Sequence, residues 1–402
     1  MIQLASRLNV IAPSATKAFT SRAKSLNERG LKITVLTHGE ADFGTPSNIC
    51  AAGVAAINYG HTRYTDSAGI LALRQAVARK LRRENNLQYS ANEVTIGCGA
   101  KQIIFNTLLC TLNPGDEVII PSPCWVSYPE LVKLVGGVPR FVQCRSDDGY
   151  QLRADALEAA ISSRTKWLIL NNPHNPTGAV YSREELTRLG KVLQRHPGVA
   201  ILSDEVYEKL IHAPGKFTSF GTAVPELVNQ TMLVNGVSKA FNMTGWRVGY
   251  GAGPPTLIAA MNLIQGQTAS QTSTISQHAA IEALDSNDSI LRRFNKLFTE
   301  RRNVAVSILE KIQGFRIFVP QGAFYLFVEC NDILKTLGPI HPVKDDVGLA
   351  LHLLEDARVA VVPGSAFFGG PGFRLSLTVD SREIADACSR IADSCKRLLD
   401  TT

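Results

Sequence analysis

Short apolar runs alternate with stretches of helical period from about residue 94 to residue 255, and this alternation limits the fold more than any other feature. The expected strands are rich in β-branched and aliphatic residues and lie at residues 94–96, 118–120, 138–142, 167–170, 200–202 and 232–234. Helices are expected after Gly99, near Glu130 and from Ser182. Such alternation is typical of an α/β fold, with a mostly parallel sheet covered by helices on both faces. Ligands bind at the carboxyl ends of strands in these sheets, where the polar clusters of this sequence fall.

The pattern changes after about residue 290, where a long charged helix is expected at residues 290–311. Alternating runs at residues 316–319 and 325–328 predict strands. A chain of 402 residues is long enough for two domains. We therefore expect a large domain at residues 47–290 and a smaller α+β domain formed by residues 1–46 and 291–402.

The N-terminal segment is not expected to target a membrane. Gln3, Arg7 and Asn9 interrupt the apolar character that a signal peptide needs, and no later run has membrane-spanning length. We expect a cytoplasmic protein. The eight cysteines are dispersed, without a CxxC pair, and the histidines lack HxxxH or HExxH spacing, so reduced thiols and no metal site are expected.

A formal net charge of +7 would suit an anionic partner, including nucleic acid. The densest basic cluster, however, alternates with Leu73, Val77 and Leu81 in an amphipathic pattern, which predicts a solvated helix face. That cluster consists of Arg79, Lys80, Arg82 and Arg83. Since no basic stripe with interleaved aromatics and no RNA-binding signature is present, nucleic acid is not expected as a partner.

Two polar motifs follow expected strands in the first half of the alternating region. GCGAKQ at residues 97–102 is a turn of small residues before a helix, and the free N–H groups of a helix N-terminus can hold a phosphate. Taken alone, a plain strand-to-helix turn is the commoner explanation. NNPHNPTG at residues 171–178 is a loop whose prolines can fix an asparagine amide toward a planar ligand. A surface turn would use the same residue types.

Three further motifs carry ionisable groups. In SDEVY, residues 203–207, Asp204 ends an apolar strand and could pair with a cationic ring nitrogen or cap a helix. Lys239 stands among small and apolar residues in VSKAF, residues 237–241, where a desolvated amine can form a Schiff base. A lone lysine is usually solvated, but Arg247 follows eight residues later in TGWRVGY, residues 244–250, where it could clamp a phosphate. Arg374 lies in the strand-like GFRLS, residues 372–376, where it would bind a carboxylate if aimed inward and be a surface charge if aimed outward.

These motifs, in this order, resemble those of the class I aminotransferases, which are pyridoxal 5′-phosphate enzymes of fold type I. The resemblance runs nearly end to end and is closest to the prokaryotic-type aspartate and prephenate aminotransferases. It rests on PSAT at residues 13–16, NPGDEV at 113–118, WVSYPE at 125–130, NPTG at 175–178 and the block from residue 238 to 250. It implies a fold type I transferase whose large domain holds a mostly parallel sheet.

The resemblance also implies roles around the cofactor. Lys239 would join pyridoxal 5′-phosphate through a Schiff base and act in catalysis. Asp204 would pair with the pyridine nitrogen, and Trp125 would stack on the ring. Tyr207 and Asn175 would bond to the ring oxygen. The residues implied at the phosphate end are Gly99, Ala100, Lys101, Ser238, Arg247 and, from a second subunit, Tyr64.

For the substrate, the resemblance implies that Arg374 binds the α-carboxylate beside Asn175 and the Gly39 backbone. Thr16 and Lys101, next to Trp125, could bind a distal carboxylate, which indicates aspartate, glutamate or prephenate. The alternative is that Lys101 is a helix-surface lysine and that the pocket takes aromatic or other neutral side chains. If Tyr64 crosses over, the working unit is a homodimer with shared active sites.

The expected reaction is a two-stage transfer of an amino group from an amino acid to a 2-oxo acid, by a ping-pong mechanism. The same fold and lysine also serve lyases and amino-acid oxidases, which the cofactor motifs do not separate. A regulator that binds the cofactor without catalysis would carry an added DNA-binding segment, and none precedes residue 30.

Overall fold

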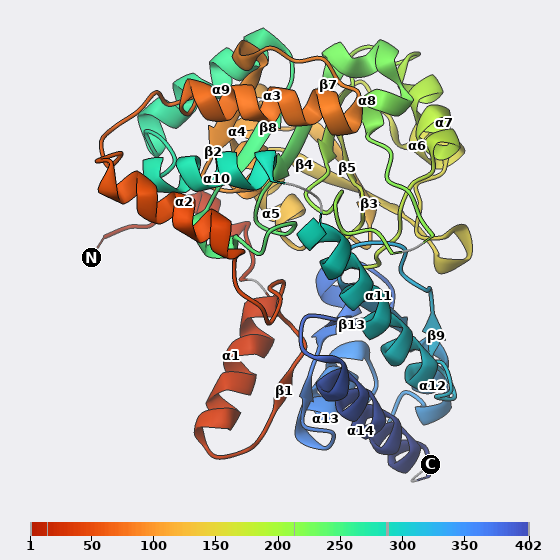
Figure 1. The fold of residues 1–402 in the computed structure, drawn as a ribbon. Helices are drawn as coiled ribbons and strands as arrows, with labels where there is room; N and C mark the ends of the chain where they lie inside the picture. The colour runs from red at the N-terminus through yellow and green to blue at the C-terminus, as the bar shows by residue number, and fades with distance from the viewer. Residues whose placement is uncertain (1, 14, 213, 287–288, 401–402) are drawn as a thin grey trace.

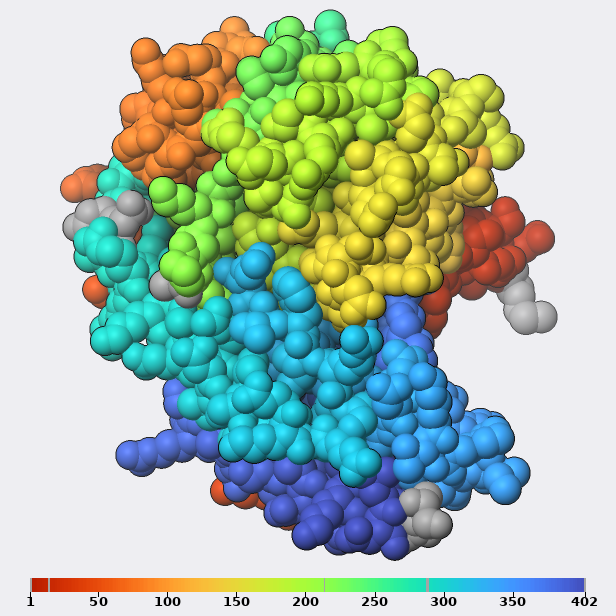
Figure 2. Space-filling model, turned by 90° about the vertical axis from the view of Figure 1, so that its right-hand side faces the viewer, coloured from red at the N-terminus to blue at the C-terminus, as the bar shows by residue number. Residues whose placement is uncertain are grey.

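The computed structural model describes residues 2–13, 15–212, 214–286 and 289–400. Ser14, in the PSAT motif, lies outside the described residues. The elements gather around two main sheets, which lie in the upper and lower parts of Figure 1. In Figure 2 the residues after about 290, cyan to blue, lie together in the lower half of the molecule.

The larger sheet has seven strands among the described residues, in the order β2-β8-β7-β6-β5-β3-β4. Their bounds are β2 Val94–Gly97, β3 Glu117–Ser122, β4 Val138–Gln143, β5 Thr165–Asn171, β6 Ala200–Asp204, β7 Thr231–Gly236 and β8 Gly249–Ala252. The run from β7 to β4 is parallel, whereas β8 is antiparallel to both of its neighbours. The expectation of a mostly parallel sheet is confirmed.

Successive side chains of the central strands pack into different cores, because they point to opposite faces of the sheet. In β3, Ile119 joins one apolar cluster while Val118 and Ile120 join another. Leu168 and Ile169 of β5 divide in the same way. Both faces are therefore covered, which explains why these strands were recognisable as continuous apolar runs.

The covering helices are α2 Ser47–Asn58, α3 Leu71–Asn85, α4 Ala100–Thr111, α5 Ser127–Leu134, α6 Ala154–Ala160, α7 Arg183–Leu193, α8 Phe220–Ala223, α9 Pro255–Thr268 and α10 Thr274–Asp285. Ser182 caps α7 as expected: its side chain accepts from the Glu185 N–H, and the Glu185 carboxylate accepts from the Ser182 N–H. Short 3-10 helices occur at Ser6–Asn9, Ala91–Glu93, Ser146–Asp148, Pro225–Gln230, Thr244–Trp246 and Gly364–Phe367.

The smaller sheet is antiparallel, in the order β12-β13-β10-β9, with a separate parallel pair β1-β11. The strands of the sheet are β9 Arg316–Ile317, β10 Tyr325–Glu329, β12 Val362–Pro363 and β13 Gly372–Ser376, and those of the pair are β1 Thr34–Val35 and β11 Val359–Ala360. The helices around it are α1 Ala15–Glu28, α11 Ser289–Leu309, α12 Asn331–Leu337, α13 Asp346–Glu355 and α14 Ser381–Asp400. Pairing of β1 with β11 brings the N-terminal segment beside the C-terminal elements (Figure 1).

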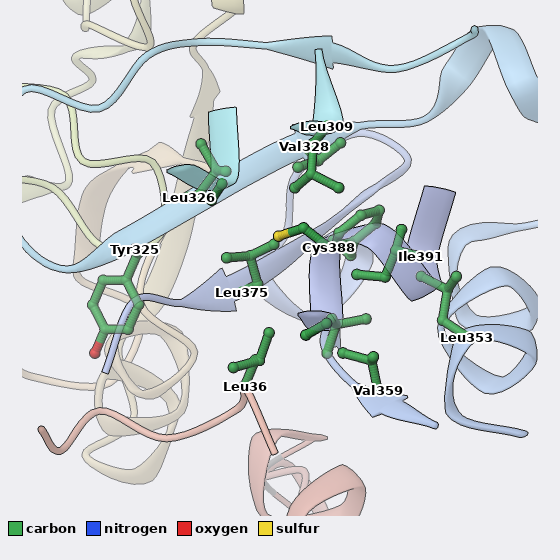
Figure 3. Packing of buried hydrophobic residues seen from close by; sticks show 14 of the residues in the cluster. Leu36, Leu309, Tyr325, Leu326, Val328, Leu353, Val359, Leu375, Cys388 and Ile391 are labelled. Carbon is green, nitrogen blue, oxygen red and sulfur yellow. The ribbon is translucent and has the colours of Figure 1, made fainter. Parts of the chain in front are cut away.

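Aliphatic side chains fill the space between this sheet and its helices. Figure 3 shows Leu326, Val328 and Leu375 from the strands meeting Cys388 and Ile391 of α14. None of the helices among the described residues is both long and apolar enough to cross a membrane.

Two expectations need correction. The strand expected at residues 316–319 ends at Ile317, because Phe318 leaves the pairing with β10 and packs edge-on against Tyr150. Arg79, Arg82 and Arg83 are exposed as expected, but Lys80 is only 2% exposed. Lys80 lies three residues after Val77 and so falls on the buried stripe of α3, where its amine donates to Asn85 and to the Glu208 carboxylate.

Candidate active site

A pocket of about 800 Å³ lies at the carboxyl ends of the parallel strands. Asn171 ends β5, Asp204 ends β6, and Lys239 follows β7, and all three line the pocket. Its other walls come from α1, the segment at residues 37–40, the start of α4, and strands β10 and β13.

Most of the residues expected at the site line this pocket: Thr16, Gly39, Ala100, Lys101, Trp125, Asn175, Asp204, Tyr207, Ser238, Lys239, Arg247 and Arg374. Gly99 lies against Arg247 at the pocket's edge. Tyr64 is 89% exposed and is not among the lining residues that the structure describes.

Lys239 lies in the turn after β7 and points its amine into the pocket. The amine donates a hydrogen bond of 2.9 Å to the Gly39 carbonyl and lies 6.0 Å from the centre of the Phe324 ring. The backbone at Gly39 therefore fixes the position of the amine.

Asp204 is 3% exposed, and its carboxylate accepts from the Tyr128 hydroxyl at 2.5 Å and from the Val206 N–H at 3.3 Å. Burial raises the pKa of Asp204 to about 6, although the Tyr128 and Val206 hydrogen bonds and the Lys239 charge act in the opposite direction. Residues 206–209 form a turn, so the alternative that Asp204 caps a helix is wrong. A buried carboxylate of this kind suits a cationic ring nitrogen.

At the N-terminus of α4, Gly99 adopts φ of +84°, and a β-carbon there would lie 2.3 Å from Nη2 of Arg247. Only glycine leaves room for this approach. Arg247 donates to the carbonyls of Cys98 (3.1 Å) and Thr244 (2.7 Å), which holds its guanidinium beside the first turn of the helix. Free N–H groups and a guanidinium at one point form a cradle that fits the phosphate of a cofactor.

Arg374 is 3% exposed and lines the pocket, so of its two alternatives the structure has the inward-facing one. It donates to the Asn175 side-chain oxygen and to the Thr37 carbonyl, each at 2.9 Å. Its Nε has no hydrogen-bond partner among the described residues. That nitrogen is itself inaccessible, but the guanidinium lines the pocket, and a buried guanidinium in a pocket wall is suited to binding a carboxylate.

Lys101 contributes further positive charge. Its amine donates to the Ser127 hydroxyl at 3.0 Å and lies 4.8 Å from the centre of the Trp125 ring. Burial lowers the pKa of Lys101, and the charges of Lys17 and Arg247 lower it further. Thr16 and Lys17 of α1 line the same pocket.

Among the lining residues that sequence reasoning missed are two buried tyrosines, Tyr128 and Tyr325. Tyr128 lies within the WVSYPE motif, and its spacing of three residues from Trp125 was the available signal. Tyr325 was assigned only to a strand. No group of three or more metal-ligating His, Cys, Asp or Glu side chains occurs in the described part of the chain.

The fold and the pocket together fit the class of enzymes that use pyridoxal phosphate, because a lysine, a buried carboxylate and a phosphate cradle surround one cavity. The family model for aminotransferase class I and II matches residues 32–391. The chain belongs to this family and is a pyridoxal-phosphate-dependent aminotransferase.

Individual relatives agree. The chain is 45% identical over 392 residues to a probable aspartate/prephenate aminotransferase of Rhizobium leguminosarum bv. phaseoli, covering 97% of this chain and 98% of that protein. An aspartate/prephenate aminotransferase of Cereibacter sphaeroides is also 45% identical, with the same coverage. The family and these relatives do not favour the lyase and oxidase alternatives.

Solved structures give the same result. The aspartate aminotransferase of Rhizobium meliloti superposes with a TM-score of 0.96 at 42% identity, covering 99% of this chain and 100% of that chain. The aspartate aminotransferase of Thermus thermophilus with maleate has a TM-score of 0.90 at 39% identity, covering 98% and 100%.

Proposed function

We propose that this aminotransferase moves amino groups between an acidic amino acid, aspartate or glutamate, and a 2-oxo acid such as prephenate, by a ping-pong mechanism. The observation that carries the proposal is the presence of Lys101 and Lys17 in the same pocket as the buried Arg374. Separate positive groups suit a substrate with two carboxylates. Names of the relatives, aspartate/prephenate aminotransferases, agree with this substrate class.

Around the cofactor, we propose the roles that the resemblance implies, supported by the place of most of these residues in one pocket. Lys239 holds the cofactor covalently, and the Asp204 carboxylate pairs with the pyridine nitrogen. The Tyr207 hydroxyl and the Asn175 amide bind the ring oxygen. The Trp125 ring stacks on the cofactor. Gly99, Ala100, Lys101, Ser238, Arg247 and the partner's Tyr64 form the phosphate end.

For the substrate, Arg374 binds the α-carboxylate with Asn175 and the Gly39 backbone beside it. Thr16 and Lys101 bind the distal carboxylate near Trp125. Bound pyridoxal phosphate supplies an electron sink for the carbanion that forms at the substrate Cα. The freed Lys239 amine would move a proton from the substrate Cα to the cofactor carbon in the first half-reaction, and from that carbon back to Cα of the second substrate in the second.

The substrate assignment is tested by comparing aspartate with phenylalanine as amino donors. In Lys101→Ala we expect kcat/KM for aspartate to fall about ten- to a hundredfold, since a charge-assisted hydrogen bond is lost, while the value for phenylalanine changes little. Lys24→Ala, which removes an exposed lysine of α1, is the control and should leave both values unchanged. An unchanged preference in Lys101→Ala would rule out Lys101 as the group that recognises the distal carboxylate.

Three further points belong to the proposal. A homodimer with shared sites is supported by Tyr64, whose 89% exposure in the single chain suits a residue that enters another subunit's pocket.

The eight free thiols suit a reducing compartment, and we propose the cytoplasm. We also propose the domain division at residues 47–290 against 1–46 and 291–402, supported by the β1–β11 pairing and by the start of α11 at Ser289.

A further inference from the structure

Tyr325 is the first residue of β10, opposite Ser376 of β13, and it is only 2% exposed. It belongs both to the core of the smaller sheet and to the pocket wall. In Figure 3 its ring lies at the edge of the cluster, and its hydroxyl points away from the labelled aliphatic side chains. The apolar core therefore anchors the ring while the polar end of Tyr325 is free to meet the active site.

The hydroxyl of Tyr325 lies 3.0 Å from the hydroxyl of Tyr207. Burial raises the pKa of Tyr207, so this hydroxyl keeps its proton. Each of the two phenol hydroxyls carries one proton. One of these protons lies in the hydrogen bond between them, and the other is available to donate to a third group. If Tyr325 donates, the Tyr207 proton is free to point into the pocket, and its donor strength rises because linked hydrogen bonds polarise one another.

The ring of Tyr325 supports Arg374. Its centre lies 4.3 Å from the guanidinium carbon, and the Phe367 ring lies at 4.7 Å from the same carbon. Cation–π contacts of this kind gain strength when water is excluded, as it is around Arg374. Two hydrogen bonds fix the guanidinium in its plane, and the rings restrict its motion out of that plane.

Tyr325 also limits the backbone that holds Lys239. A β-carbon at Gly39 would lie 2.7 Å from the Tyr325 hydroxyl, so the two groups are in close contact. The Gly39 carbonyl accepts the hydrogen bond of the Lys239 amine. One side chain thus touches the surroundings of Tyr207, Arg374 and Lys239.

We propose that Tyr325 is a positioning residue with two separable actions. Its hydroxyl donates to Tyr207 and so directs the Tyr207 proton toward the cofactor ring oxygen. Its ring holds Arg374 in the orientation that binds the substrate α-carboxylate. The inference rests on the proposed roles of Tyr207 and Arg374.

The two actions predict different effects on the holoenzyme. The linkage between Lys239 and the cofactor carries a proton that is lost as the pH rises. A hydrogen-bond donor on the cofactor ring oxygen withdraws electron density from this linkage and lowers its pKa. A weaker donor therefore lets the linkage keep its proton to higher pH. Besides Lys239 itself, the charged and titratable groups that line the pocket are Lys17, His38, Glu40, Lys101, Tyr128, Asp204, Tyr207, Arg247, Tyr325 and Arg374. The first readout is therefore the pH titration of the visible absorbance band. The second is the dissociation constant of maleate, an unreactive dicarboxylate, measured from the change that it causes in this band.

In Tyr325→Phe, which loses only the hydroxyl, we expect the titration midpoint to rise by about half to one pH unit, with maleate affinity within about twofold of wild type. In Tyr325→Leu, which also loses the ring, we expect the same rise and about tenfold weaker maleate binding. If Tyr325→Leu does not fold, Tyr325→Met replaces it. Tyr150→Phe is the matched control, because it removes a buried hydroxyl that binds Glu329 outside the pocket.

The outcomes separate this inference from the proposed function. A wild-type band that does not respond to maleate contradicts the proposed function itself. If the wild type responds but Tyr325→Phe titrates unchanged, the role of the hydroxyl is overturned. Unchanged maleate binding in the folded Leu or Met variant overturns the role of the ring. Equal effects in Tyr150→Phe would show a general structural effect and overturn both.

Discussion

Gly99 and Arg247 meet so closely that the side chain at residue 99 decides where the guanidinium can lie. In Gly99→Ala the added carbon would overlap Nη2 of Arg247. We expect the variant to hold pyridoxal phosphate about ten- to a hundredfold more weakly, because the displaced guanidinium loses its charge-assisted hydrogen bonds to the phosphate. Equilibrium titration of the cofactor-free protein with pyridoxal phosphate measures this.

Gly115→Ala is the matched control for that variant. Gly115 also has a positive φ, +90°, but a β-carbon there would meet no atom within 4 Å. Both variants therefore carry backbone strain, and only Gly99→Ala disturbs the cradle. Equal cofactor affinity in the two variants would contradict the proposed contact between Arg247 and the phosphate.

The charged residues of the pocket were easier to predict from the sequence than the residues that support them. Lys239, Asp204 and Arg374 were recognisable because a charged group beside an apolar run needs an explanation. Tyr128 and Tyr325 were not, since a tyrosine in a helix or strand is ordinary, and only the tertiary fold brings their hydroxyls to Asp204 and Tyr207. Lys80 was misjudged because its acceptor, Glu208, is distant in sequence.

Among the elements, the loop at residues 38–42 depends on helix α11. Arg301 of α11, 3% exposed, donates to both carboxylate oxygens of Asp42 (2.7 and 3.0 Å) and to the Leu377 carbonyl at 3.3 Å. This pair anchors the loop whose Gly39 carbonyl holds the Lys239 amine.

Asp42→Asn should lower the free energy of unfolding by about 2 kcal/mol, because it leaves the Arg301 charge buried without its counter-ion. This value is smaller than that for a fully buried pair, since the Asp42 side chain is partly exposed. Chemical denaturation measures the change. Asp155→Asn, which breaks a comparable bidentate pair with exposed Arg153, should cause no measurable change. Equal stability of the two variants would show that the loop does not depend on Arg301.

Strands buried on both faces were predictable because the whole run must be apolar, as in β3 and β5. The end of β9 could not be predicted in this way, since Phe318 is as apolar as a strand residue. Phe318 leaves the strand because it packs against Tyr150, which lies in a loop distant in sequence. The pairing of β1 with β11 was likewise beyond local pattern, although an association of the N-terminal stretch with the smaller domain was expected.

The proposed homodimer with shared sites predicts complementation between two variants that are each expected to be inactive. Lys239→Ala lacks the proposed catalytic amine, and Tyr64→Ala lacks the residue proposed to enter the partner's site. When equal amounts are unfolded and refolded together, half the dimers are mixed, and each has one site with both residues intact. We expect activity to return to about a quarter of the wild-type value. No recovery, despite dimers in analytical ultracentrifugation, would place Tyr64 outside the partner's site.

In the proposed function, Lys239 holds a cofactor that carries amino groups between an acidic amino acid and a 2-oxo acid. The most direct measurement is the visible absorbance spectrum of the purified holoenzyme before and after aspartate, and again after 2-oxoglutarate, with Lys239→Ala as the control. We predict a visible band that shifts with aspartate and returns with 2-oxoglutarate in the wild type, and no such cycle in the variant. A band that changes with neither compound would contradict the assignment of acidic substrates. The absence of any band after addition of pyridoxal phosphate would contradict the role of Lys239 in holding the cofactor.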